Sequence, residues 1–262
     1  MADSLKIRSV EKRFNSGQTD VTALTGIDLD VAEGEFVVVV GPSGCGKSTL
    51  LRLVGGLTLP SRGMVHVRGA EVREPSPDAG FVFQSAVLLP WRTVLDNVLF
   101  SMEMLGERRD AYRERALGLI ELAGLRGFEG KYPWELSGGM QQRVAICRAL
   151  VHDPDLLLMD EPFGALDAMT REEMSFELLR IWGERRKTIL FVTHSIPEAI
   201  LLSDRVVVMT PRPGRLARVL EIDLPRPRTV EMEFDERFKK ASDEIRSLIF
   251  ARRPEAASAG RG

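Results

Sequence analysis

A glycine-rich segment near the start of the chain has the residue types and spacing of a phosphate-binding loop. It reads GPSGCGKST, so two glycines are separated by four residues and are followed by a lysine and a serine. Glycines let the backbone curl with its N–H groups pointing inward, where no Cβ obstructs an approaching phosphate. The residues expected to bind a nucleoside triphosphate through this loop are Gly41, Pro42, Ser43, Gly44, Cys45, Gly46, Lys47, Ser48 and Thr49.

Two side chains of the loop supply a charge and a metal ligand. The ammonium group of Lys47 can neutralise the β- and γ-phosphates, and the hydroxyl of Ser48 can ligate Mg²⁺. A helix that begins near Lys47 adds the positive end of its dipole. The sequence therefore predicts that the chain binds a nucleoside triphosphate together with magnesium.

The segments on either side of the loop support this prediction. Val37–Val40 is an uninterrupted β-branched run, which predicts a buried strand that ends at Gly41. Leu50–Leu53 then begins the apolar face of a helix. Because strand, glycine loop and helix follow in the order that a phosphate-binding loop requires, a fortuitous glycine-rich turn is the weaker alternative.

Further polar side chains follow apolar segments, at points where buried strands are expected to end: Gln84, Asp160, Glu161 and His194. Open α/β sheets bind ligands at the carboxyl ends of their strands. Asp160 is placed to hold Mg²⁺ through water as a carboxylate partner of Ser48, and Glu161 would face an attacking water instead. Gln84 could contact the metal or that water, and His194 could reach the γ-phosphate.

These positions give two sets of candidates. The candidate catalytic residues are Lys47, Gln84, Glu161 and His194, and the candidate metal ligands are Ser48, Gln84 and Asp160. Each strand-end residue also has a plain structural alternative, because acids, amides and histidines at such ends are often only solvated or satisfied structural groups.

The composition excludes several classes of protein. The net charge of −2 over 262 residues gives no basic surface for nucleic acid. Cys45 and Cys147 are poorly matched to a disulfide framework, which favours a reducing compartment. The charged N-terminus does not fit a signal peptide, and no apolar run approaches the roughly 18 residues of a membrane span. We therefore expect a soluble, cytoplasmic protein.

Strand and helix patterns alternate along the chain. The segments with strand character are Leu5–Arg13, Met64–Val67, Gly80–Phe83, Leu156–Met159, Thr188–Val192 and Val206–Met209. The segments with helical spacing are Val94–Leu105, Ala111–Leu122, Gln141–Val151 and Arg171–Glu184. This alternation predicts an α/β fold with a parallel sheet covered on both faces.

Changes in the pattern divide the chain into parts. Residues 1–85 and 151–224 are expected to form an ATP-binding core, residues 86–150 an inserted helical subdomain, and residues 225–262 a C-terminal helix and tail. That helix is predicted from an amphipathic pattern over Phe234, Phe238, Ala241, Ile245, Leu248 and Ile249. The polar segments Asn15–Asp20 and Ala256–Gly262 are expected to be a turn and a frayed end.

One further motif suggests a family. Leu136–Gln141 reads LSGGMQ and resembles the signature sequence of ATP-binding cassette (ABC) ATPases. Met140 replaces the usual glutamine, but the backbone donors of the two glycines are kept. The resemblance covers Leu5 to about Leu224, with all motifs in family order, and it implies a P-loop NTPase (RecA-like) core with an N-terminal antiparallel β part and an inserted α-helical subdomain.

The resemblance also implies a dimer in which two chains sandwich two ATP molecules head to tail. Residues Ser137, Gly138 and Gly139 would then bind the nucleotide of the second chain, and Asp167 would belong to a loop that crosses the interface. Phe14 resembles the aromatic residue that stacks on adenine, with core filler as its alternative.

The resemblance also implies separate membrane permease subunits as partners. They would bind near Gln84–Arg92, where Trp91 and Arg92 have the composition of an interface. Trp91 in the core of the helical insert is the alternative. LLPW, together with PRPGRL at Pro211–Leu216, is similar to ATPases of bacterial nitrate, sulfonate and taurine importers.

This similarity implies an ATP-hydrolysing importer subunit that lies peripherally on the inner face of the membrane. A solute-binding protein is then an indirect partner. An exporter subunit, a soluble ABC ATPase acting on DNA or the ribosome, and a regulatory subunit without turnover are the alternatives.

Overall fold

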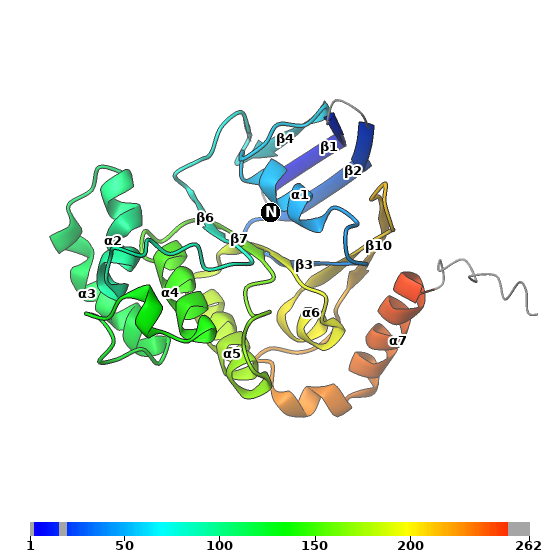
Figure 1. Cartoon of the computed structure of the whole chain (residues 1–262). Coiled ribbons are helices and arrows are strands. Elements are labelled where there is room, and N and C mark those ends of the chain that lie inside the picture. Colours follow the sequence, from blue (N-terminus) through cyan, green and yellow to red (C-terminus); the bar gives the residue numbers. More distant parts are fainter. Residues whose placement is uncertain (1–2, 16–19, 251–262) are drawn as a thin grey trace, which may run out of the picture.

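A computed structural model of the chain describes residues 3–15 and 20–250, and its centre is a six-stranded sheet (Figure 1). Its strands, in spatial order, are β10 (Leu216–Glu221), β9 (Arg205–Met209), β3 (Phe36–Val40), β8 (Thr188–Val192), β7 (Leu156–Asp160) and β6 (Ala79–Val82). From β9 to β6 neighbouring strands are parallel, whereas β10 pairs antiparallel with β9. Every residue of β3, β7 and β8 is buried, as expected for parallel strands covered on both faces.

One face of this sheet is covered by a second, antiparallel sheet. Its strands, in spatial order, are β2 (Asp20–Ala32), β1 (Asp3–Asn15), β4 (Arg62–Val67) and β5 (Ala70–Glu71). Helix α1 (Lys47–Val54) lies between the two sheets and packs on β7, β8, β4 and β2 (Figure 1). The helix that follows the glycine-rich loop is therefore held on both sides by apolar residues.

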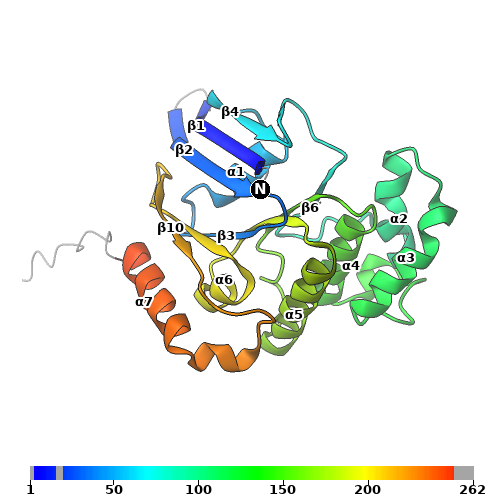
Figure 2. The ribbon, with the colours of Figure 1, turned by 180° about the vertical axis from the view of Figure 1, so that it is seen from behind.

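The other face of the six-stranded sheet carries α5 (Ala168–Arg185), α6 (Ile196–Leu202) and α7 (Glu236–Phe250), which Figure 2 shows from behind. The rings of Trp182 and Phe191 each lie 6.1 Å from the ring of Phe36 in the core under these helices. Helix α7 packs on α6, β9 and β10, and it is preceded by a 3₁₀ helix, η2 (Val230–Phe234). The C-terminal helix thus completes the core of the nucleotide-binding part.

The helical part lies to one side of the sheets (Figure 1). It contains α2 (Val94–Met104), α3 (Arg109–Leu122), the short 3₁₀ helix η1 (Pro133–Glu135) and α4 (Gly138–Leu150). These helices enclose an apolar cluster of their own. Helix α4 also gives Ile146, Ala149 and Leu150 to the main core, so α4 connects the two parts. The division of the chain into domains stays a prediction.

The α/β fold expected from the sequence is confirmed, and every strand and helix named above is present within a few residues of its expected bounds. Helix α6 and strands β5 and β10 were missed. The placement of Phe234 on the final helix is wrong, because this residue ends η2 and its side chain is 89% exposed. Most of the polar turn at residues 15–20 and the whole tail from residue 251 lie outside the described residues.

Cys45 and Cys147 are buried free thiols, and burial raises the pKa of Cys147 to about 12. Across residues 3–15 and 20–250, none of the helices combines the length and the apolar character needed to span a bilayer.

The burial of α7 leads to a test that uses two phenylalanines of the C-terminal segment. Phe238 is 5% exposed in the main core, so Phe238→Ala should lower the free energy of unfolding by about 3 kcal/mol through the cavity that it leaves. Phe234→Ala removes the same ring from a solvent-exposed position and should change that free energy by less than about 0.5 kcal/mol. Urea titrations of the two variants measure both values, and equal losses would contradict the packing of α7 described here.

Candidate functional site

The glycine-rich loop lies between the end of β3 and the start of α1, as its sequence predicts. Gly44 and Gly46 have φ values of +73° and +106°, a region that side-chain-bearing residues rarely adopt. The buried Lys47 ammonium group donates hydrogen bonds to the carbonyl oxygens of Gly41 at 2.9 Å and Pro42 at 3.2 Å. The charge is thereby held over the loop, where it can meet the phosphates of a nucleotide.

Close packing behind the loop fixes its shape. A Cβ on Gly46 would lie 2.6 Å from Leu24 Cδ2, and a Cβ on Gly214 would overlap the carbonyl oxygen of Cys45. Gly214 is joined to β2 by two backbone hydrogen bonds, to the carbonyl of Ala23 at 2.9 Å and from the amide of Thr25 at 3.0 Å. The turn before β10 therefore supports the loop from outside.

Arg212 in the same turn is a contact that the sequence analysis missed. Its Nε donates to the carbonyl oxygen of Gly44 at 3.2 Å, at the tip of the glycine-rich loop. The sequence signal was present, since PRPGRL was singled out, but only as a turn and as a family resemblance. What the sequence lacked was the information that residues 168 positions apart meet.

Ser48 and Asp160, the two residues predicted to hold the metal, lie together at one corner of the site. The Ser48 hydroxyl donates to Asp160 Oδ1 at 3.0 Å, and Asp160 is the buried last residue of β7. Burial raises the pKa of Asp160, and the Ser48 hydrogen bond acts in the opposite direction. Octahedral Mg²⁺ holds oxygens at about 2.1 Å, which puts neighbouring ligands about 3 Å apart, so this hydroxyl and carboxylate fit that ion.

Glu161 follows Asp160 but faces a different set of groups. Its φ of +46° is left-handed, and its amide donates to the carbonyl of Val192 at the end of β8 at 2.9 Å. One carboxylate oxygen, Oε2, lies 3.4 Å from Gln84 Nε2 and 3.2 Å from His194 Nδ1. Because a carboxylate only accepts, Nδ1 carries the hydrogen of this contact, and Nε2 of the ring is left to meet another ligand.

The structure therefore brings the strand-end candidates together in two adjoining groups. Ser48 and Asp160 suit a hard cation, whereas Gln84, Glu161 and His194 surround a position open to water. Strain at a non-glycine residue in the left-handed region costs about 1–3 kcal/mol and is typical of functional sites. The arrangement can bind a triphosphate and polarise a water beside its terminal phosphate. The roles of the single residues stay predictions.

The signature segment forms a second group of free backbone donors. Ser137 caps α4, with its Oγ accepting from the amide of Met140 at 3.3 Å. Gly138 is exposed and a Cβ there would meet nothing within 4 Å, while a Cβ on Gly139 would lie 3.0 Å from Leu166 Cδ2. This open helix N-terminus can bind an anion that approaches from outside.

Asp167 lies next to Leu166 and caps α5. Its Oδ1 accepts from the amide of Thr170 at 3.0 Å, and this hydrogen bond lowers the pKa of Asp167. Through Leu166, the segment that carries Glu161 and Asp167 packs against the signature glycines. The signature helix α4 itself packs on α2, α3 and β6, whereas α1 packs on the sheets, so the two anion-binding segments belong to different parts of the molecule (Figure 1).

Two aromatic residues whose roles the sequence left open are exposed. Phe14 is 45% exposed, with Lys12 Nζ 5.1 Å from its ring centroid, so the core-filler alternative is wrong. Trp91 is 70% exposed, which excludes the core of the helical part. A nucleobase contact for Phe14 stays a prediction.

Arg92, which the sequence grouped with Trp91 as an interface residue, is paired within the helical part and is only partly exposed. The guanidinium of Arg92 is half-buried, donates to both carboxylate oxygens of Glu103 at 2.7 and 2.8 Å, and lies over the ring of Phe100. Arg92 therefore ties the segment before α2 to Glu103 within that helix through charge-assisted hydrogen bonds from one guanidinium nitrogen.

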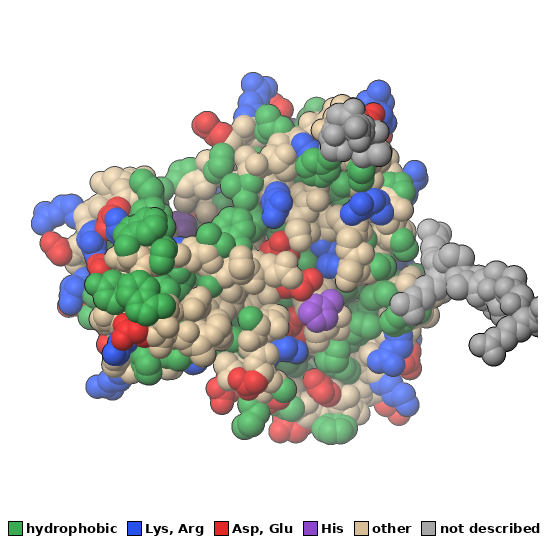
Figure 3. Space-filling model, in the orientation of Figure 1, with side chains coloured by type: hydrophobic (Ala, Val, Ile, Leu, Met, Phe, Trp, Pro, Cys, Tyr) green, Lys and Arg blue, Asp and Glu red, His purple; other side chains and the backbone are tan. Residues whose placement is uncertain are grey.

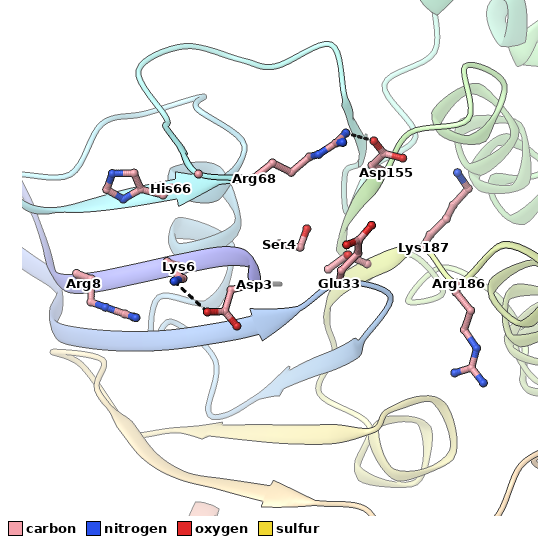
Figure 4. A pocket seen from close by; sticks show the side chains of 12 residues that line it. Asp3, Ser4, Lys6, Arg8, Glu33, His66, Arg68, Asp155, Arg186 and Lys187 are labelled. Atoms are coloured by element: carbon pink, nitrogen blue, oxygen red, sulfur yellow. Dashed lines mark hydrogen bonds and ion pairs between the residues drawn. The ribbon is translucent and has the colours of Figure 1, made fainter. Parts of the chain in front are cut away.

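A cavity of about 930 Å³ lies elsewhere, and Figure 4 shows the charged side chains that line it. Asp155 and Lys187 in its wall directly precede β7 and β8, so the cavity is at the amino ends of the parallel strands. Lys6 pairs there with Asp3 at 3.0 Å. Since the candidate residues lie at the opposite strand ends, this cavity is separate from the site described above.

Comparisons with known proteins agree with this geometry. The family model described as "ABC transporter" matches residues 24–164. An uncharacterized ABC transporter ATP-binding protein of Methanocaldococcus jannaschii is 52% identical over 241 residues, 92% of this chain and 90% of that protein. The taurine import ATP-binding protein TauB of a Jannaschia species is 48% identical over 215 residues, 81% of this chain and 80% of that protein.

A solved structure is also similar to the chain. It is the dimer of an ATP-binding cassette in a post-hydrolysis state bound to ADP and Pi, and it is 34% identical, with a TM-score of 0.76, over 84% of this chain and all of that one.

Proposed function

We propose that this chain, an ATPase that belongs to the ABC transporter family, supplies the energy for uptake of a small solute through separate membrane subunits. The observation that carries the proposal is that Glu161 is joined by Gln84 and His194 beside the glycine-rich loop, while Gly138 of the signature segment is open to solvent in another part of the molecule. The taurine import relative and an aliphatic sulfonates import relative from Bacillus licheniformis support a solute of the taurine or sulfonate kind.

The active form is a head-to-tail dimer with two ATP molecules in its interface. Each chain holds the phosphates with its own loop, and the amides behind Ser137 contact the nucleotide of the other chain. Such an interface is isologous and closes as a twofold dimer. The dimeric cassette bound to ADP and Pi supports this arrangement.

Within that dimer, each residue of the site has a defined task. Lys47 neutralises the β- and γ-phosphates, and His194 reaches the γ-phosphate through the ring nitrogen that does not face Glu161. Glu161 orients and polarises the attacking water, and Gln84 shares that position. Ser48 and Asp160 would hold Mg²⁺, which supplies positive charge to the phosphates when it is bound.

The membrane partner binds at an apolar groove between the two parts of the chain. This groove has a volume of about 450 Å³, and its wall includes Phe81, Phe83, Val87, Phe100, Met104 and Leu105. Figure 3 shows hydrophobic side chains gathered over the helical part on one face of the molecule. An amphipathic helix at the cytoplasmic end of a permease is the partner that suits such a groove, because its apolar face is buried there.

Trp91 extends this binding surface and is presented rigidly. The buried Asn97 accepts from the amide of Leu89 at 2.8 Å and donates to the carbonyls of Leu89, Arg92 and Thr93 at 3.0–3.1 Å. These bonds fix the loop on both sides of Trp91 although its side chain is in solvent. An ordered, exposed tryptophan is typical of an interface anchor.

Hydrogen bonds connect the groove to the site. Arg148 of α4 donates to the carbonyls of Ala86 at 3.0 Å and Val87 at 2.9 Å, and Gln142 donates to the carbonyl of Phe83 at 3.0 Å. The same helix begins at the signature glycines, and Gln84 lies inside the segment that it holds. The contacts of a partner in the groove therefore depend on whether ATP has brought the two chains together. This dependence couples ATP occupancy to the pore.

In the proposed function, the chain lies on the cytoplasmic face of the membrane and is attached through its partner subunits. Exporter subunits and soluble ABC ATPases would share the nucleotide site, so they differ from an importer only in what they bind. Identification of the proteins that co-purify with the tagged chain from solubilised membranes distinguishes them: a permease with a solute-binding protein supports import, and ribosomes or DNA contradict it.

The proposed task of Glu161 can be tested by Glu161→Gln, which keeps the size of the side chain and one acceptor oxygen but removes the charge and the second acceptor. We expect steady ATP turnover to fall by about 100-fold or more, since general base catalysis contributes that much, while an ATP-bound dimer accumulates on a sizing column. Glu114→Gln, at an exposed position of α3, is the matched control and should retain turnover. Normal turnover in Glu161→Gln would remove Glu161 from its role.

The groove proposal is tested by Trp91→Ala. An interface anchor contributes about 2 kcal/mol to the binding free energy, so its loss weakens binding about 30-fold. The membrane subunits should therefore no longer co-purify with the tagged chain. Phe234→Ala, which removes an even more exposed aromatic ring from η2, should retain them. Retention of the membrane subunits by Trp91→Ala would count against this surface as the permease contact.

A further inference from the structure

Two aromatic side chains that precede the signature segment are stacked in solvent. The rings of Tyr132 and Trp134 have centroids 4.5 Å apart and planes inclined by 4°. Tyr132 is 36% exposed and Trp134 is 66% exposed. Packing of the fold does not explain two large aromatic groups in solvent, so this aromatic pair indicates a binding site for a ligand.

The backbone that carries the aromatic pair is rigid. The Tyr132 amide donates to Glu135 Oε2 at 2.7 Å, and the Glu135 amide donates back to the Tyr132 carbonyl at 2.9 Å. Lys131 pairs with Glu135 at 2.9 Å, and the Lys131 carbonyl accepts from the amide of Val94 in α2 at 2.8 Å. A turn held in this way presents the rings without a further cost in ordering them.

The turn is also joined to the signature helix. Gln141 of α4 donates from its amide side chain to the carbonyl of Pro133 at 2.9 Å, and Pro133 is buried. Trp134 lies three residues before Ser137, a stretch that spans at most about 10 Å. A ligand whose anionic group binds to the open amides beyond Ser137 can therefore contact the aromatic pair with the rest of its structure.

We propose that the aromatic pair is a stacking platform for the base of the nucleotide held by the second copy of this chain. The inference rests on the head-to-tail dimer proposed above, in which the signature amides face the terminal phosphate of that nucleotide. A nucleoside triphosphate has an anion at one end and a flat base at the other, which matches free amides followed by exposed rings. The base is then contacted by Phe14 of the chain that holds its phosphates and by Trp134 of the other chain.

The experiment uses the full chain with Glu161→Gln, so that ATP is not consumed, and measures the nucleotide concentration at which half of the protein is dimeric. Adding Trp134→Ala should raise this concentration for ATP about tenfold or more, since stacking on one base is worth that much. Trp134→Phe, which keeps a flat ring, should recover most of the loss. Phe234→Ala is the matched control and should leave the value unchanged.

A second nucleotide separates stacking on a base from contact with protein. The smaller base of CTP offers less stacking area, so Trp134→Ala should cost less with CTP than with ATP and reduce the preference for ATP. An equal loss with both nucleotides, or no loss with ATP, would overturn the stacking platform. If the chain with Glu161→Gln alone does not dimerise with ATP, the proposed dimer itself fails, and that result is distinguishable because it does not involve Trp134.

Discussion

The parallel pairing of β3, β8 and β7 is the constraint on which the candidate site depends. Parallel strands in register end at one edge of the sheet, and everything that follows them is brought to that edge. For this reason Ser48 and Asp160, which are 112 positions apart, meet at 3.0 Å. Glu161 directly follows β7, and its left-handed backbone turns its side chain toward His194, which follows β8. Two adjacent carboxylates thereby acquire different neighbours and, in the proposed mechanism, different tasks.

The same constraint explains why one chain carries its second anion-binding segment in another part of the molecule. The signature glycines begin α4, which is packed with the helical part, and Gly138 is open to solvent. Helix α4 shares residues with two cores and donates hydrogen bonds to the carbonyls of Phe83 and Val87 beside the groove. In the proposed dimer, ATP binding, chain association and the membrane partner are therefore linked by one helix.

The sequence predicted the features that depend on local pattern. Buried parallel strands appear as apolar runs, and Ser137 before a helix is a recognisable cap, so the sheet, the glycine-rich loop and the helical part were all foreseen. It did not predict features that depend on distant contacts. The support of the loop by Arg212, the burial of Arg92 against Glu103 and the stacking of Tyr132 on Trp134 each require a known fold. Strand β10 was missed because an edge strand with one exposed face lacks the apolar run of its neighbours.

In the proposed mechanism, two copies must associate before either can cleave ATP. The rate of ATP hydrolysis per chain, followed over a dilution series at saturating ATP and magnesium, tests this requirement. If two chains form each site, the rate per chain must fall in proportion to protein concentration once the dimer dissociates, and must approach zero at high dilution. A rate per chain that stays constant over the whole series would show that a single chain is sufficient and would contradict the account.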